Sequence, residues 1–363
     1  MWPDRRLTDL LQIKHPIVLA PMTGIGTVEL AGSVCAAGGL GSIGCAAMQP
    51  DLAAKTIQAL RARTDKPINV NFFCHVQAKA DPDREQAWHG RLSPYYSEFE
   101  IDPELPRAHV DIAPFDNAMC KVVENTKPEV VSFHFGIPDS ALMARVKAVG
   151  CRIMASATTV PEAVWLEGRG VDIIIAQGYE AGGHRGMFLA PNLNRASASQ
   201  PGTFALVPQV VDAVTVPVVA AGGIADGRGI AAAIALGAAG TQIGTAYLLC
   251  PEAATPSPYR DALRHARADS TFLTNVFTGR PARTLVNRLA LEVGPISDAL
   301  PDFPLPMGHL VPLRAKAEQQ GNSDFTPFWS GQASPLGREM PAEELTLKLA
   351  EEAIERFKQL NDR

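Results

Sequence analysis

The chain has 363 residues, of which 46% are hydrophobic and 20% are charged. This composition is typical of a globular protein with enough apolar side chains for a large core, and it excludes a disordered or collagen-like chain. The formal net charge is -5. Without a run of Lys or Arg, the chain offers no basic surface to nucleic acid or to an anionic membrane.

The sequence also disfavours membrane insertion, export and metal binding. The longest apolar stretch, 229–240, is shorter than the roughly 20 residues of a spanning helix. The first residues include Asp4, Arg5 and Arg6 and lack the apolar core of a signal peptide. The cysteines form no CxxC pair and the histidines no HxxxH or HxxE spacing, which indicates reduced thiols and no metal site. We therefore expect a cytoplasmic protein, monomeric or homodimeric.

Eight short apolar runs, bounded by Gly or Pro, predict β-strands. Their apolar character is continuous, as expected of parallel strands that are buried on both faces. Helical patterns at 50–63, 140–149, 160–168 and 226–236 separate several of these runs. This alternation predicts an α/β fold, a closed (β/α)8 TIM barrel rather than an open doubly wound sheet. The predicted strands are 16–22, 39–45, 68–73, 130–135, 152–157, 172–177, 217–221 and 241–247.

Two regions depart from the alternation. Residues 74–127 are too long for one connection, and with a helix predicted at 83–96 they indicate an insertion after strand 3. The region after Cys250 shows no strand pattern, and we expect a mostly helical region that covers the barrel mouth. Its predicted elements are helices at 258–268, 313–320 and 342–359 and a Pro-rich loop at 294–312. The predicted division is a barrel at 1–250, a covering region at 251–335 and a C-terminal helix packed on the barrel at 336–363.

Glycines follow the last two predicted strands, where TIM barrels commonly bind phosphate. Gly222 and Gly223 end one strand, and the run Gln242-Ile243-Gly244-Thr245 belongs to the other. Glycines there let backbone N–H groups approach an anion. The alternative is that Gly-Gly merely turns the strand into a helix. A second pattern, GxGxxG at 39–44, lies inside a predicted strand and so lacks the context of a dinucleotide site.

Two histidines are candidates for chemistry. Residues 177–186 read QGYEAGGHRG, in which flexible backbone presents His184 beside several glycines. Imidazole is the side chain best suited to proton transfer near neutral pH. The alternative is an exposed His on a loop. His134 ends the fourth predicted strand, where a core role is the alternative, and Asn69 and Asn71 share one face of the third strand. A thiolate at Cys74 beside His75 is disfavoured because neighbours on a strand point apart.

Taken together, these motifs resemble the nitronate monooxygenase family, formerly called 2-nitropropane dioxygenase. The similarity covers about residues 10 to 335, and the run at 177–186 is its most specific part. It is carried also by PMTG at 21–24, NVNFF at 69–73, SFHFG at 132–136, AGGI at 221–224, QIGT at 242–245 and FWSGQ at 328–332.

The resemblance implies a TIM barrel that holds FMN noncovalently. It implies His184 as the catalytic histidine and His134 as a substrate-pocket residue. By the resemblance, residues 21–24 at the end of strand 1 would lie along the isoalloxazine ring, and Asn71 and Gln177 would hydrogen-bond it. Gly182 would approach the ring, while Gly222, Gly223 and residues 242–245 would cradle the phosphate. The implied cofactor residues are Pro21, Met22, Thr23, Gly24, Asn71, Gln177, Gly182, Gly183, Gly222, Gly223, Gln242, Ile243, Gly244 and Thr245.

The implied reaction is oxidation of alkyl nitronates, such as propionate 3-nitronate, by O2 to an aldehyde or ketone plus nitrite. The nearest alternative is an NAD(P)H-dependent FMN reductase on the same barrel, acting on an enoyl-acyl carrier or a quinone. A barrel that binds a phosphorylated ligand without redox chemistry is a third reading. Some relatives carry Tyr and Lys in the C-terminal segment, whereas residues 300–311 here contain Phe303 and Met307 and no Tyr or Lys.

Overall fold

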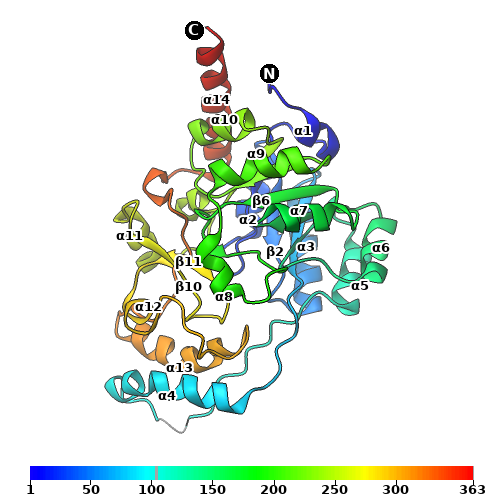
Figure 1. Ribbon diagram of the computed structural model, residues 1–363. Coiled ribbons are helices and arrows are strands. Elements are labelled where there is room, and N and C mark those ends of the chain that lie inside the picture. Colours follow the sequence, from blue (N-terminus) through cyan, green and yellow to red (C-terminus); the bar gives the residue numbers. More distant parts are fainter. Residues whose placement is uncertain (103–104, 363) are drawn as a thin grey trace.

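A computed structural model of the protein describes residues 1–102 and 105–362. The predicted insertion at 74–127 includes residues 103 and 104, and the predicted C-terminal segment at 336–363 includes residue 363, all of which lie outside the described residues. Figure 1 shows strands at the centre of the molecule, helices around them, and a group of yellow, orange and cyan elements to one end.

Eight parallel strands form the barrel. They follow the order β1-β9-β8-β6-β5-β4-β3-β2, and a parallel bridge from Val18 to Leu40 brings β1 beside the chain that enters β2. The predicted (β/α)8 fold is confirmed; seven predicted strands contain a barrel strand, and the eighth, 241–247, overlaps β9, which begins one residue earlier. The strands are β1 (Ile17–Leu19), β2 (Gly41–Gly44), β3 (Ile68–Phe73), β4 (Val130–His134), β5 (Arg152–Ala157), β6 (Ile173–Gln177), β8 (Val218–Ala221) and β9 (Gly240–Ile243).

Two predicted strands were too long. Strand β1 stops at Leu19, so Pro21 and Met22 belong to the loop beyond it. Strand β9 stops at Ile243, and the apolar residues that follow form the 3-10 helix η2 (Thr245–Leu249). An apolar run marks burial, and buried residues beyond a strand end carry the same signal.

The helices pack outside the barrel, and most of the predicted ones are present within two residues of their expected ends. The short α8 and η1 and the long α9 all lie between β6 and β8. The helices of this layer are α2 (Val28–Ala36), α3 (Pro50–Arg63), α5 (Asn117–Thr126), α6 (Ser140–Ala148), α7 (Val160–Glu167), α9 (Thr203–Ala213) and α10 (Gly227–Ala235). Helix α1 (Arg6–Leu11) instead contributes Leu7 and Leu11 to a separate buried cluster with the strand residues Val18, Val130 and Ile173. The short elements in the connection between β6 and β8 are α8 (Leu193–Ala196) and η1 (Ser197–Ser199).

The C-terminal helix α14 (Ala342–Asn361) completes this outer layer. It packs against both α10 and α2, the helices that follow β8 and β1. It therefore takes the eighth helix position, although the last barrel strand ends about 100 residues earlier in the chain. Buried Leu345 and Leu349 belong to the main core cluster. Within the described residues, no helix is long and apolar enough to cross a membrane.

The expectation that no strands follow Cys250 was wrong. Strands β10 (Thr271–Thr274) and β11 (Ala282–Leu285) pair antiparallel, and β11 also pairs with the two-residue β7 (Gly183–His184). The sequences TFLT and ARTL have four residues each and mix polar with apolar side chains. They lack the continuous apolar run of a barrel strand because they form a small separate sheet.

The Pro-rich loop predicted at 294–312 was also too long. Helix α13 (Pro306–Gln319) starts at its first proline and contains a second, Pro312. Proline fits the first turn of a helix, where its missing N–H is not needed, so a run of prolines here marks a helix start rather than an irregular loop. The remaining elements of this region are α11 (Ser257–Arg264), α12 (Arg288–Val293) and η3 (Ser334–Leu336).

The insertion after β3 and the C-terminal region pack on each other. Helix α4 (Pro82–Glu98) lies against α13, and Figure 1 shows the two side by side in cyan and orange. Trp88, Tyr96, Leu313 and Phe325 are buried in the apolar cluster between them. This cluster holds α13 in place above the barrel, where one face of the helix borders the cavity described next.

Candidate active site

A cavity of about 400 Å³ lies at the carboxyl ends of the barrel strands. Most of the predicted site residues line it, although they come from six different strands and their loops. Gly24 and Ile243 do not line it, and Ile243 is a core residue. The predicted residues on the cavity wall are Pro21, Met22, Thr23, Asn71, His134, Gln177, Gly182, Gly183, His184, Gly222, Gly223, Gln242, Gly244 and Thr245.

One side of the cavity is the loop after β1. The backbone N–H groups of Ile25 and Gly26 donate to the carbonyl oxygen of Met22 at 3.0 and 2.6 Å, which closes a tight turn. Thr23 packs directly on Gly44, where a Cβ atom would lie 2.7 Å from the Thr23 hydroxyl. Gly44 belongs to the GxGxxG pattern, and its role here is close packing within the barrel wall.

A group of glycines forms a second side of the cavity. Gly222 and Gly223 both have positive φ, +113° and +71°, which side chains rarely adopt. A Cβ atom on Gly182 would lie 2.5 Å from the backbone nitrogen of Gly331, which itself donates to Thr245 Oγ1 at 3.0 Å. These residues form bare backbone around one end of the cavity, as an anion site requires.

Glu180 holds the segments around this glycine group together, a role that the sequence analysis did not predict. The backbone N–H of Thr203 donates to Glu180 Oε2 at 2.7 Å, and the Thr203 hydroxyl lies 2.9 Å from the Gly222 oxygen. The backbone N–H of Gln332 donates to the backbone carbonyl oxygen of Glu180 at 3.0 Å. Glu180 thus joins the loop after β6 to the segment that carries Gly331.

Gln242 provides a polar atom without a partner. Among the described residues, nothing donates to its buried Oε1 atom, and the side chain lines the cavity. An unpaired buried acceptor is costly, so such an atom is typical of a place where a ligand donates a hydrogen bond. Asn71 is better satisfied, since its Nδ2 donates to Ser132 Oγ at 2.9 Å, while Asn69 lies deeper and outside the cavity wall.

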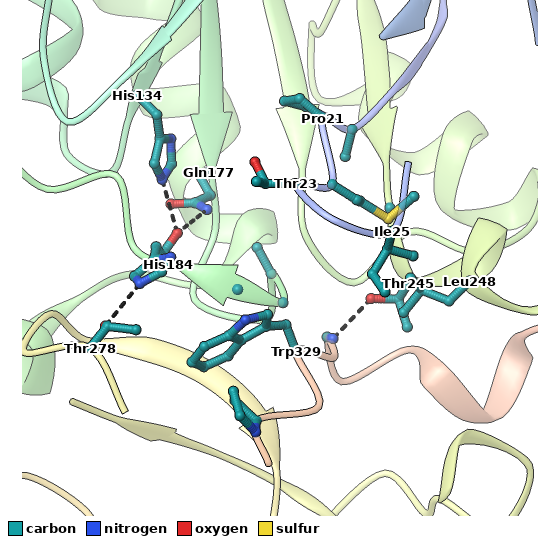
Figure 2. Close-up of a pocket in the computed structure, with 18 of the residues that line it drawn as sticks. Pro21, Thr23, Ile25, His134, Gln177, His184, Thr245, Leu248, Thr278 and Trp329 are labelled. Carbon is teal, nitrogen blue, oxygen red and sulfur yellow. Dashed lines mark hydrogen bonds between the residues drawn. The ribbon is translucent and has the colours of Figure 1, made fainter. Parts of the chain in front are cut away.

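His184 projects from the short strand β7, and its backbone is held from two sides (Figure 2). Gln177 Nε2 donates to the His184 carbonyl oxygen at 2.9 Å, and His134 Nε2 lies 3.1 Å from the same oxygen. The backbone N–H of Gly186 donates to Gln177 Oε1 at 2.8 Å. The His184 ring itself meets Thr278, with 2.9 Å between Nε2 and the hydroxyl oxygen.

Both imidazoles in the cavity are neutral at ordinary pH. Burial lowers the pKa of His134 to about 4. Burial, together with His134, Arg280 and His75, lowers the pKa of His184 to about 3. Aromatic rings surround His184, with ring centroids of Phe303 and Trp329 at 5.6 and 5.4 Å. A neutral imidazole can donate a hydrogen bond from one ring nitrogen and accept one at the other.

Sequence reasoning missed the residues that reach His184 from the C-terminal region. Thr278 lies 94 residues further along the chain, in a turn without a distinctive pattern, and Phe303 was noted only as a departure from relatives. Cys74 has a pKa that burial raises well above its usual value, in agreement with the rejected thiolate. Within the described part of the chain, no group of three or more His, Cys, Asp or Glu residues could hold a metal ion.

The fold and the cavity define a TIM barrel with a cavity at its strand ends that is lined by glycines and by two neutral imidazoles. The family model described as nitronate monooxygenase matches residues 4–352. The chain therefore belongs to the nitronate monooxygenase family, a group of flavin-dependent oxidoreductases.

Individual relatives agree with this assignment. A nitronate monooxygenase of Pseudomonas aeruginosa is 43% identical over 349 residues, 96% of this chain and 98% of the relative. One of Paraburkholderia phytofirmans is 43% identical over 358 residues, covering 98% and 97%. Among solved structures, a nitroalkane oxidase from Streptomyces ansochromogenes has a TM-score of 0.87 at 37% identity, covering 98% and 99%. FabK from Thermotoga maritima has a TM-score of 0.73 at 30% identity, covering 100% and 99%.

Proposed function

We propose that this protein binds FMN in the cavity and oxidises alkyl nitronates with O2 to an aldehyde or ketone plus nitrite. The observation that carries the proposal is the position of His184. Its neutral imidazole lines a mostly apolar cavity whose wall also includes Gly222 and Gly223. The relatives with nearly full-length similarity are named nitronate monooxygenases.

The residues present fit a flavin mononucleotide. The backbone around Gly222, Gly223 and Thr245 suits a phosphate, because all three residues line the cavity and the two glycines carry no side chain. The unpaired Gln242 Oε1 accepts from a donor on the ligand, and Asn71 and Gln177 offer further polar contacts. Pro21 and Met22, in the loop after β1, add apolar surface to the cavity wall. FMN supplies the redox chemistry when bound, taking electrons from the substrate and passing them to O2.

The protein's own contribution is to bind and orient the substrate. A nitronate is an anion with two oxygens, and a neutral imidazole can donate one hydrogen bond to it from a ring N–H. Burial of His184 excludes water from that contact and strengthens it. Phe303 and Trp329 keep the surroundings apolar.

The test is an anaerobic absorbance spectrum of the purified protein. Propionate 3-nitronate should bleach the bound flavin, whereas NADH and NADPH, added separately, should reduce it slowly or not at all. Rapid reduction by either nicotinamide would instead support a reductase, as the similarity to FabK allows. A colourless protein that takes up no FMN would overturn both readings. The same sample, analysed by light scattering, tests the expected monomer or homodimer.

A further inference from the structure

One face of helix α13 forms a continuous stripe along the cavity. Met307, Leu310, Val311 and Arg314 all line it, and their spacing of three, four and seven residues places them on one side of the helix. Leu310 is buried, while Val311 and Arg314 are exposed. The stripe therefore runs about 10 Å along the helix axis, from the interior towards solvent.

The inner end of the stripe reaches the histidine. Phe303, just before α13, has its ring centroid 5.6 Å from that of His184. The ring centroid of Trp329 lies 5.4 Å from that of His184 and 5.7 Å from that of Phe277. Phe277, Phe325 and Pro327 also line the cavity. We call this surface the α13 wall; it consists of Phe277, Phe303, Met307, Leu310, Val311, Phe325, Pro327 and Trp329.

The α13 wall contains no charged anchor. Among the described residues that line the cavity, Arg314 is the only Lys, Arg, Asp or Glu. Its Nε donates to Glu318 Oε1 at 2.7 Å in an ion pair at the outer end of the stripe. The Thr326 hydroxyl donates to the same oxygen at 2.7 Å, which holds Glu318 beside Arg314. The charge of the guanidinium is offset by this partner and is far from the inner end.

We propose that the α13 wall selects nitronates with an unbranched apolar chain over those that carry a second anionic group. This inference rests on the proposed function, because it assumes that the reacting carbon sits beside His184. Substrate methylene groups that pack along the wall are transferred from water to an apolar surface, and each added carbon therefore stabilises the complex further. The carboxylate of propionate 3-nitronate would instead be desolvated against the same wall without a cation.

The first experiment compares kcat/KM for a series of linear nitronates from ethyl to hexyl nitronate. The value should rise roughly fourfold per methylene, the equivalent of the usual gain for a buried CH2. Propionate 3-nitronate should be a poorer substrate than butyl nitronate, which has a chain of similar length. A flat series, or a preference for propionate 3-nitronate, would overturn the proposal while leaving nitronate oxidation intact.

Substitution of Val311 tests the wall directly. Val311→Lys places a cation on the stripe and should lower the ratio of kcat/KM for hexyl nitronate over propionate 3-nitronate at least tenfold. Val164→Lys is the matched control, because Val164 lies on α7 away from the cavity and has 46% exposure against 44% for Val311. The control should keep the ratio of the unmodified protein. Equal ratios in both variants would count against the wall.

A binding measurement separates this inference from the proposed function. Hexanoate and succinate carry a planar anion with two oxygens, like a nitronate, and differ in whether the far end is apolar or charged. Calorimetry on the flavin-loaded protein should show hexanoate binding at least tenfold more tightly. If hexanoate is preferred but no nitronate is oxidised, the wall stands and the proposed function fails. If nitronates are oxidised and succinate binds as well as hexanoate, the wall fails alone.

Discussion

The Nε2 atom of His134 lies 3.1 Å from the backbone oxygen of His184. A carbonyl oxygen only accepts hydrogen bonds, so Nε2 carries the proton of this neutral ring. The Nδ1 atom then accepts from the Ser156 hydroxyl, 3.0 Å away. Together with the Gln177 amide, this donor fixes the backbone from which the His184 ring projects. We therefore propose that His134 acts on the reaction through His184, as a positioning residue.

Substitutions at His134 should follow the ability of the new side chain to donate. His134→Phe removes the donor and should lower kcat about tenfold with a small change in KM, because misplacement of His184 weakens transition-state contacts most. His134→Gln has an amide N–H and should recover part of the loss. Steady-state kinetics with one nitronate gives both constants. Equal losses in the two variants would indicate a packing role instead.

His184→Asn should keep the cofactor and lose most turnover. The backbone bonds to residue 184 remain, whereas the imidazole N–H that binds the nitronate oxygens is gone. Loss of one positioned hydrogen-bond donor to a reacting anion typically costs 100-fold or more in rate. The measurements are flavin content and kcat/KM with a nitronate. The control is His265→Asn, because His265 is an exposed histidine just after α11. This variant should behave like the unmodified protein. An unchanged kcat/KM in His184→Asn would remove the assigned role.

The pH dependence of activity should lack a step from His184. Its pKa is lowered to about 3, so the ring stays neutral at every pH above about 5. We expect kcat/KM, measured with preformed nitronate in buffers from pH 8 down to pH 6, to show no loss with an apparent pKa near 6.5, the value of an ordinary histidine. A clear loss centred near 6.5 would show that the ring is more hydrated than the structure indicates.

The free energy of unfolding should depend on pH through three buried histidines. His15, His75 and His134 have pKa values lowered to about 4, mainly by burial. Between about pH 6.5 and 4 the unfolded chain binds more protons than the folded one, so stability is full above pH 6.5 and falls as pH decreases. Tm at pH 7.5 and pH 5.0 measures the fall. The difference should shrink in His134→Gln and stay unchanged in His265→Gln.

Sequence patterns located the barrel because each of its strands is buried on both faces and reads as an apolar run. They also located the glycines at 222 and 223, whose positive φ requires that residue type. The patterns missed β10 and β11, since a small sheet above the barrel needs no continuous apolar run. They also missed the turn that carries Thr278. Its contact with His184 depends on how two distant segments pack, and neither segment shows this locally.

The α13 wall also could not be predicted from the sequence. The sequence predicted only the second half of α13, at 313–320, because prolines stand at the start of the helix and in its interior. Only when the helix is placed do Met307 and Val311 fall on one face. The partner that holds the helix there is α4, from the insertion after β3. The position of this pocket wall depends on the packing of two segments that are far apart in the chain, so the wall has no sequence signature of its own.

Gly182→Ala should disrupt the glycine group without unfolding the barrel. The new Cβ would lie 2.5 Å from the backbone nitrogen of Gly331 and 2.7 Å from the carbonyl carbon of Ser330, so backbone must move. We expect FMN affinity to fall at least tenfold, measured by fluorescence titration of the apoprotein. Gly90→Ala is the control, because Gly90 lies in helix α4 with open space around its Cβ position. It should bind FMN normally and gain about 0.5–1 kcal/mol of stability.

Gln242→Met should separate ligand binding from folding. The unpaired Gln242 Oε1 is a cost to the empty protein, so an apolar side chain of similar size should leave the apoprotein equally or more stable. The hydrogen bond to the ligand is lost at the same time, and FMN should bind about tenfold more weakly. Thermal unfolding of the apoprotein and FMN titration measure the two effects. Gln209→Met, on the exposed side of α9, should change neither. A variant that is less stable without FMN and binds it normally would show that Gln242 serves the barrel rather than the cofactor.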